Sequence, residues 1–359
     1  MLGSGINYVE VYSEKEYTVM ALDGVVCKSE TPFQTLEIVD SAHYGRSLIL
    51  DGSWQSSSND EAMYHEALVH PACIAAAALG GTDSPTSVLV LGGGEGATVR
   101  EALRWPGVER VVMVDLDRAV VDACREHMPE FADGAFEDPR VEVVYGDALA
   151  YLRDASSADA DLFDVIIHDL SDPIDEGPSQ ALFTTQTFQA AGRILAPNGV
   201  FALQSGMITP FLDLHVKTYS TLRASFASIA SYGTFIPSFR SLWGFCMGSN
   251  APNAQSVWDS LADTQTVDAI LEKAGLSQAL ITLDGEHLRG MISHPKWLRQ
   301  AYQAETTVFS SESSTAPPTA APTSDTPQDP VSDPGVSAPS YASETNKSDV
   351  TNLLKRSTQ

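Results

Sequence analysis

Short apolar runs alternate with amphipathic segments across the middle of the chain, and this alternation constrains the fold more than any other feature. The amphipathic segments have apolar residues three and four positions apart, as helices do, and cover residues 97–105, 118–128, 148–154 and 179–195. The apolar runs are SVLVLGG, RVVMVDL, VEVVYGD, FDVIIHDL and GVFALQS, at residues 87–93, 110–116, 141–147, 163–170 and 199–205. Together they predict an α/β fold with a doubly wound, mostly parallel sheet.

The two ends of the chain have other patterns. Residues 17–55 alternate apolar and polar side chains between turn signals such as Asp51-Gly52, which predicts a small antiparallel β domain. After residue 302 the chain is rich in Pro, Ser and Thr and poor in large apolar side chains, so it cannot bury enough surface to fold. We therefore expect a β domain over residues 1–66, a catalytic α/β domain over 67–302 and a disordered tail over 303–359.

Composition limits the possible partners. With 47 Asp and Glu against 21 Lys and Arg, the formal net charge is -26. Nucleic acid is excluded as a partner because its binding needs clustered basic residues, whereas a cationic ligand suits this charge. The four cysteines have no metal-ligand spacing and suggest free thiols in a reducing compartment. No targeting or membrane-spanning segment is evident, so we expect a cytoplasmic protein that does not bind membranes.

Three predicted strands end in residues suited to an adenosine ligand. The first ends in a glycine turn with Gly92, Gly94 and Glu95, the second in Asp115, and the third in Asp147-Ala148. Such strand ends meet at one edge of a Rossmann-like sheet, where an acid following the second strand binds ribose. A glycine turn alone is weak evidence, and each Asp could instead cap a helix. Glu95 disfavours a dinucleotide phosphate and suits a cationic sulfonium or ammonium ligand.

The fourth predicted strand ends in a pair of carboxylates, Asp169 and Asp172, at the expected substrate end of the cleft. Ser171-Asp172-Pro173 also has the composition of a turn, and a metal pair would need further oxygen ligands that the adjacent sequence does not supply. His168 points to the opposite side of the strand from Asp169, so we expect a hydrogen-bonded structural residue there.

These motifs together resemble the polyamine aminopropyltransferases, the spermidine and spermine synthase group. The resemblance extends from about residue 8 to 302 and includes the motifs GGGEGAT, VDLD, YGDA and DLSDP, with Gly177-Pro178, Leu182-Phe183 and the N-terminal Asp60-Glu61-x-x-Tyr64-His65-Glu66. Several variants within these motifs and beyond them look like the thermospermine synthase branch: Glu95, the Leu170-Ser171 pair and the segments IPSF, WGF, DGE and RGM. The fold of this group is like that of S-adenosylmethionine-dependent methyltransferases.

The resemblance implies a reaction and a set of roles. Decarboxylated S-adenosylmethionine would be a co-substrate that donates an aminopropyl group to spermidine, with no metal or resident cofactor, in a homodimer. Asp169 would be the catalytic base and Asp172 an anchor for the acceptor. Glu95 would bind the donor's ammonium. The remaining donor contacts would be Gln34, Tyr64, His65, Gly92, Gly94, Asp115, Asp147 and Ala148, and the remaining acceptor contacts Gln55, Gln204, Trp243 and Glu286.

Other functions remain open. The acceptor could differ, which would make the product spermidine or spermine. An S-adenosylmethionine methyltransferase is a second alternative, but the donor's carboxylate would then lie near Glu95, which is unfavourable. A polyamine- or nucleoside-binding protein without activity is a third, against which the intact Asp169 and Asp172 argue. For Trp243 core packing is an equal alternative to binding.

Overall fold

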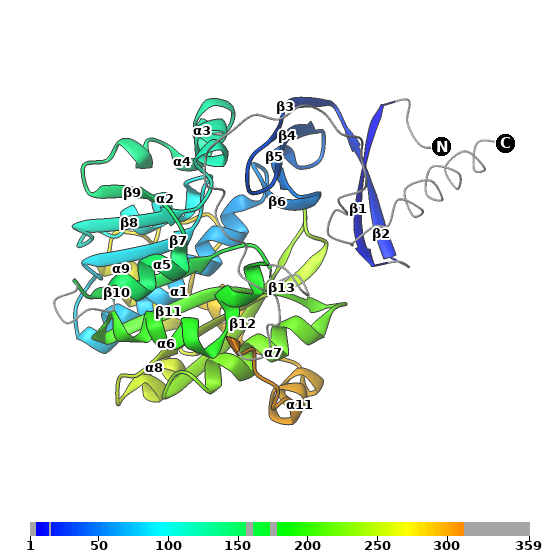
Figure 1. The fold of residues 1–359 in the computed structure, drawn as a ribbon. Helices are drawn as coiled ribbons and strands as arrows, with labels where there is room; N and C mark the ends of the chain where they lie inside the picture. The colour runs from blue at the N-terminus through cyan, green and yellow to red at the C-terminus, as the bar shows by residue number, and fades with distance from the viewer. Residues whose placement is uncertain (1–4, 14–15, 156–160, 173–177, 312–359) are drawn as a thin grey trace, which may run out of the picture.

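A seven-stranded sheet forms the centre of the molecule (Figure 1). The computed structural model describes residues 5–13, 16–155, 161–172 and 178–311. The strand order is β12-β13-β11-β10-β7-β8-β9. Its parallel strands are β7 (Ser87–Gly92), β8 (Arg110–Asp115), β9 (Val141–Tyr145), β10 (Phe163–Asp169) and β11 (Leu195–Thr209). The predicted parallel sheet is confirmed, but the sequence did not predict its antiparallel edge, β12 (Ser228–Ile236) and β13 (Ser241–Ser249).

Helices cover both faces of this sheet. On β7, Val88 and Val90 face one apolar cluster, to which α1 contributes, and Leu89 and Leu91 face another, to which α5 and α6 contribute. The strand is therefore apolar on both sides, as a buried parallel strand must be. The helices are α1 (Glu61–Gly80), α2 (Ala97–Leu103), α3 (Arg118–His127), α4 (Pro129–Ala132), α5 (Ala148–Ala155), α6 (Thr185–Arg193), α7 (Leu212–Arg223), α8 (Ala254–Ser260), α9 (Thr264–Lys273), α10 (Gly285–Ile292) and α11 (Lys296–Ala304), with 3-10 turns η1 (Ala135–Glu137) and η2 (Pro178–Phe183).

The N-terminal region is antiparallel, as expected, and forms two small sheets. The first pairs β1 (Ile6–Ser13) with β2 (Glu16–Leu22) and lies at one side of the molecule (Figure 1). The second contains β3 (Gly24–Glu30), β4 (Thr35–Ser41), β5 (Gly45–Leu50) and β6 (Ser53–Ser57). Leu36, Ile38 and Leu48 of this sheet pack against Cys124 and Phe131 of α3 and α4. One apolar face therefore attaches the β region to the larger sheet.

Helix α1 connects the two regions and crosses the interior. It is buried on all sides from His65 to Ala77 and packs against α2, β10, β11 and β12. The expected domain boundary at residue 66 lies inside this helix. There the buried Glu66 carboxylate accepts hydrogen bonds from the backbone N–H groups of Ile281, Thr282 and Leu283 and from the Thr282 hydroxyl. Glu66 thus fixes a distant loop to the core.

Two expectations about local structure are corrected. The helix expected over 179–195 is divided into η2 and α6, because the Thr184 side chain accepts from the backbone N–H of Thr187 and begins a new helix. The first residues of the expected tail are packed: Phe309 bonds through its backbone to Thr185 and to the hydroxyl of Thr221. Residues 312–359, the rest of that tail, lie outside the described residues.

All four cysteines are free thiols, as expected. Within the described ranges no helix combines the length and apolar character needed to cross a membrane.

The Glu66 cluster predicts a stability effect. Replacing Glu66 by Ala removes the buried acceptor of three backbone N–H groups and a hydroxyl, so the free energy of unfolding should fall by roughly 3 kcal/mol or more. Urea denaturation followed by circular dichroism measures this loss. Glu66→Gln keeps one oxygen and should lose less, and Glu272→Ala, on the exposed side of α9, is the control. A Glu66→Ala loss below roughly 1 kcal/mol would contradict the assigned role.

Candidate active site

The glycine turn after β7 brings the ends of three strands together. A Cβ on Gly92, whose φ is +85°, would lie 2.1 Å from the backbone oxygen of Asp169. That oxygen accepts a 3.2 Å hydrogen bond from the N–H of Gly93. A Cβ on Gly94 would lie 2.9 Å from a carboxylate oxygen of Asp115. Only glycine fits at position 92, and a side chain at position 94 would displace the Asp115 carboxylate, so the turn packs directly on the end of β10 and beside the end of β8.

Asp169 is held at the end of β10 by two hydroxyl groups. The Tyr64 hydroxyl donates to Oδ1 at 2.8 Å and the Thr98 hydroxyl donates to Oδ2 at 2.5 Å. Burial and the nearby Glu95 raise the pKa of Asp169, while His65, Thr98 and Tyr64 lower it. Asp169 is therefore a carboxylate of fixed orientation whose basicity is above the usual range.

His65 lies between two glutamates. Its Nε2 is 3.1 Å from a carboxylate oxygen of Glu95, and its Nδ1 is 2.8 Å from a carboxylate oxygen of Glu61. Burial opposes the charged ring, but the hydrogen bonds to Glu61 and Glu95 raise the pKa of His65 to about 10. His65 thus joins the start of α1 to the carboxylate that follows the glycine turn.

The ribose-acid candidate, Asp115, lies beside the glycine turn. Burial raises its pKa to about 6, although the backbone N–H of Asp117 donates to it at 2.8 Å and lowers the pKa. The expected donor contact Gln34 is joined to this region, because its side-chain amide donates to the buried Asp117 at 3.1 Å. The Thr31 hydroxyl donates to the same carboxylate. The loop before β4 is thereby attached to the edge of the large sheet.

Asp147 has the bond expected of a helix cap. Its Oδ1 accepts from the N–H of Leu149 at 2.9 Å in the first turn of α5, and its side chain is exposed, whereas Ala148 is buried. This cap leaves the second carboxylate oxygen for other contacts.

Gln204 positions the second carboxylate of the pair. From β11 its Nε2 donates at 2.8 Å to the backbone oxygen of Leu170 and at 2.8 Å to Oδ1 of Asp172, and its Oε1 accepts from the N–H of Gly206. Burial raises the pKa of Asp172 to about 6, and the Gln204 bond lowers it. A cation bound beside Asp172 would lower this pKa further. Pro173 and Gly177 of the same motif lie outside the described residues.

An aromatic cluster lies beside Tyr64. Its ring centroid is 5.9 Å from that of Phe239 and 5.6 Å from that of Phe245. Phe239 is in turn 4.7 Å from Trp243, which is 9% exposed. Trp243 is therefore part of the packing around Tyr64, whose hydroxyl donates to Asp169.

Two expected acceptor contacts have local partners. Gln55 donates to the backbone oxygen of Ser53, and the exposed Glu286 pairs with Arg289 at 3.0 Å within α10. His168 is confirmed as structural: it is fully buried, its Nε2 lies 3.1 Å from the oxygen of Leu182, and burial lowers its pKa to about 4.

Three site residues were missed by sequence reasoning. Thr98 and Glu61 contact the expected residues directly, and Asp117 joins the two sheets. The signals were present, since Thr98 follows the glycine turn and Glu61 lies four residues before His65, one helical turn away.

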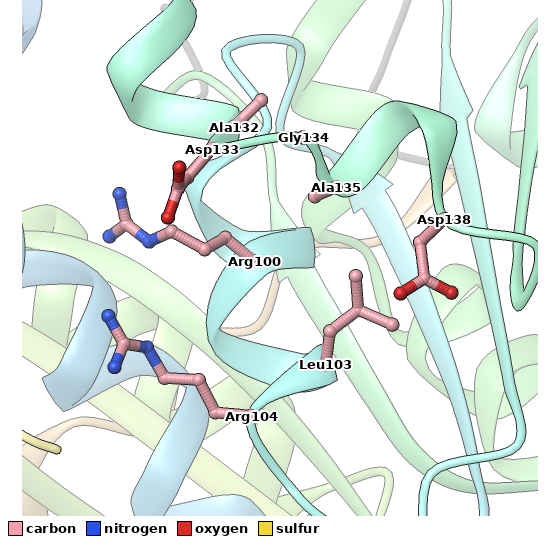
Figure 2. Close-up of a pocket in the computed structure, with 8 residues that line it drawn as sticks. All are labelled: Arg100, Leu103, Arg104, Ala132, Asp133, Gly134, Ala135 and Asp138. Carbon is pink, nitrogen blue, oxygen red and sulfur yellow. The ribbon is translucent and has the colours of Figure 1, made fainter.

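A pocket of about 200 Å³ lies on the outer side of α2, lined by Arg100, Leu103, Arg104, Ala132, Asp133, Gly134, Ala135 and Asp138. Figure 2 shows Arg100 and Arg104 projecting from the same helix toward one side of it. The site residues described above do not line this pocket. Within the described ranges, no group of three or more His, Cys, Asp or Glu side chains is placed to hold a metal ion.

Comparison with known proteins identifies the family. The model of the spermine/spermidine synthase domain matches residues 61–257. The chain belongs to the spermine/spermidine synthase family. Residues 9–57 of this synthase family member match the spermidine synthase tetramerisation domain, which indicates an oligomer. The donor in the family is decarboxylated S-adenosylmethionine, used as a substrate without a metal.

Relatives agree with this assignment over most of the chain. A polyamine aminopropyltransferase of Synechococcus sp. (strain JA-2-3B'a(2-13)) is 42% identical over 303 residues, 84% of this chain and 94% of its own length. One of Aeropyrum pernix is 39% identical over 298 residues, 83% and 91% of the two chains. A spermidine synthase solved with the transition-state analogue AdoDATO has a TM-score of 0.73 and 25% identity, over 84% of this chain and 97% of that one. The match includes both the β region and the α/β fold.

The Tyr64 contact predicts a change in the pH profile. Tyr64→Phe removes a donor that lowers the pKa of Asp169, so this pKa should rise and the acid limb of kcat/KM should move to higher pH. The loss of a hydrogen bond to a charged group predicts a roughly 10- to 100-fold lower kcat/KM near neutral pH. Steady-state kinetics across pH tests both effects.

Tyr232→Phe is the matched control. The Tyr232 hydroxyl is buried and has no hydrogen-bond partner within the described part of the chain. Its removal should leave the pH profile unchanged. An unshifted acid limb in Tyr64→Phe would argue against the role of this hydroxyl.

Proposed function

We propose that the protein transfers the aminopropyl group of decarboxylated S-adenosylmethionine to spermidine, giving thermospermine and methylthioadenosine. A nitrogen of the acceptor attacks the aminopropyl carbon that is bound to the sulfonium sulfur. The carbon–sulfur bond breaks, sulfur keeps the electron pair as a neutral thioether, and the nitrogen loses a proton. The observation that carries this proposal is the fixed carboxylate of Asp169, three residues before a second carboxylate, beside the glycine turn.

Asp169 is proposed as the base. An amine attacks only when neutral, whereas a free amine has a pKa of about 10. Burial of the amine and the adjacent sulfonium charge lower that pKa, while burial and Glu95 raise the pKa of Asp169. The two values approach one another, which makes proton transfer to a carboxylate feasible. Tyr64 and Thr98 hold both oxygens in place for it.

The donor is proposed to lie across the ends of β7, β8 and β9. Asp115 would bind the ribose and Asp147 the adenine amino group. Glu95 would bind the ammonium of the aminopropyl group, with Gln34 and Tyr64 as further contacts, and the fully buried His65 would act through Glu95. A methyltransferase is disfavoured, because the carboxylate of its donor would lie beside Glu95.

The acceptor is proposed to lie beyond Asp169, with Asp172 as its anchor. Gln204 holds Asp172 in place. The Asp172 carboxylate is half-buried, and a cationic amine that pairs with it would offset the free-energy cost of this burial. Two segments that suggest the thermospermine branch, IPSF and WGF, supply Phe239 and Phe245, whose rings contact Tyr64. This proximity supports spermidine as acceptor, with spermidine or spermine synthesis as the alternative. Trp243, Gln55 and Glu286 stay predictions as acceptor contacts.

The homodimer expected from the sequence also stays a proposal. The tetramerisation-domain match supports association through residues 9–57 without fixing the number of subunits.

Product analysis tests the acceptor. The purified protein, incubated with decarboxylated S-adenosylmethionine and either putrescine or spermidine, should form thermospermine from spermidine. Chromatography against thermospermine and spermine standards measures it. Spermine as the product would support the alternative, and the absence of any tetraamine would contradict spermidine as acceptor.

Replacement of the base tests the mechanism. Asp169→Asn should lower kcat by about 10²- to 10⁴-fold, the usual contribution of a general base. Binding of the donor, measured by calorimetry, should survive. Asp164→Asn lies at the opposite end of β10 and serves as the matched control, with turnover per folded molecule unchanged. Near-normal turnover of Asp169→Asn would remove this residue from the mechanism.

A further inference from the structure

Both ring nitrogens of the fully buried His65 face acceptors. Nε2 faces a carboxylate oxygen of Glu95 at 3.1 Å. Nδ1 faces the Glu61 carboxylate at 2.8 Å and the Glu61 backbone oxygen at 2.8 Å. A neutral imidazole has one N–H and can donate on one side only. With an ionised carboxylate on each side, both ring nitrogens can donate only if the ring carries two protons and therefore a positive charge.

The charge state of Glu61 is itself fixed by Arg100. Nη2 of Arg100 lies 3.1 Å and 2.8 Å from the two carboxylate oxygens of Glu61, an arrangement that stabilises the ionised carboxylate. Arg100 is held in turn by Glu101 at 2.8 Å and by the backbone oxygen of Phe131 at 2.8 Å. Burial raises the pKa of Glu61, but its bonds to His65 and Arg100 outweigh burial and lower the pKa.

Four charges of alternating sign thus lead from α2 into the site: Arg100, Glu61, His65 and Glu95. Each is bound to the next by a contact of 3.1 Å or less. Only the last belongs to the glycine turn. We infer that His65 is a permanent imidazolium, fixed by Glu61 and Arg100 as positioning residues, and that it orients the Glu95 carboxylate toward the ammonium of the donor. This inference rests on the proposed function for the identity of that donor.

The imidazolium also acts on the base. The charged and titratable groups around His65 are Asp60, Glu61 and Tyr64 at the start of α1, Glu95 in the turn, Arg100 behind Glu61, and Asp169 at the end of β10. His65 lowers the pKa of Asp169, whereas Glu95 raises it. The same cation therefore allows two carboxylates to remain ionised near each other. If His65 became neutral, the pKa of Asp169 would rise.

The protonation state can be measured directly. Two-dimensional NMR of protein labelled with ¹⁵N-histidine distinguishes an imidazolium from either neutral tautomer. In the wild type, the His65 signals should remain those of an imidazolium through pH 8.5, about two units above the ordinary histidine pKa. A neutral His65 at pH 7.5 in the wild type would overturn the inference.

The variant Glu61→Gln tests the positioning role. It keeps an acceptor for Nδ1 but removes the charge, so His65 should titrate near its ordinary pKa of about 6.5. Affinity for decarboxylated S-adenosylmethionine should fall about tenfold, the loss of one oriented charge contact. Affinity for methylthioadenosine, which lacks the ammonium, should not change. The acid limb of kcat/KM should move to higher pH.

Two outcomes separate this role from a merely structural one. An equal loss of affinity for both ligands in Glu61→Gln would contradict the orientation of Glu95 by His65. Asp122→Asn removes the same charge from the exposed face of α3 and should change neither affinity. Failure of the wild type to bind decarboxylated S-adenosylmethionine would instead overturn the proposed function, while the NMR titration still decides the charge of His65.

Discussion

The close contact between a glycine turn and the end of a neighbouring strand determines the rest of the site. Gly92 and Gly93 approach the backbone of Asp169 so closely that a side chain at Gly92 would overlap its carbonyl oxygen. The first helix after the turn then places Thr98 on Asp169, and the turn itself places Glu95 on His65. A backbone requirement at one or two residues thus positions acids from separate parts of the chain at one edge of the sheet.

Electrostatic repulsion is the cost of this arrangement. Glu95, Asp115, Asp169 and Asp172 share one edge of the sheet in a chain of net charge -26. Burial raises the pKa of three of them, Asp115, Asp169 and Asp172. The structure offsets the repulsion with hydrogen bonds from Tyr64, Thr98 and Gln204, and with one buried imidazolium. The repulsion that remains favours cationic ligands, because a bound cation relieves it.

The sequence predicted the parallel strands and their ends well, because buried parallel strands are continuous apolar runs that stop at the site. It did not predict β12 and β13, whose small residues Gly233, Gly244 and Gly248 weaken a strand pattern that packing nevertheless stabilises. Helix α1 has no polar face, so its helical period was hidden.

The site was predictable only in part. The proximity of the acids follows from their positions at the ends of parallel strands. The contact of the Thr98 hydroxyl with Asp169, in contrast, depends on the angle at which α2 leaves the turn. Gln204 was expected as an acceptor contact, and its bond to Asp172 became visible only when the register of β11 was known. Gln55 and Glu286 were expected by resemblance alone, and no strand-end argument tied them to the cleft.

Neighbouring residues at the beginning of α1 include both structural residues and residues of the site. Asp60 binds the β12–β13 hairpin through Ser238, Tyr64 and His65 bond to Asp169 and Glu95, and Glu66 holds the loop at residues 281–283. A mutational survey of this segment would therefore find these four positions intolerant, for unrelated reasons. Loss of function there would not identify catalytic residues unless folding were measured in the same variants, and natural divergence of this segment should be slow even where the chemistry changes.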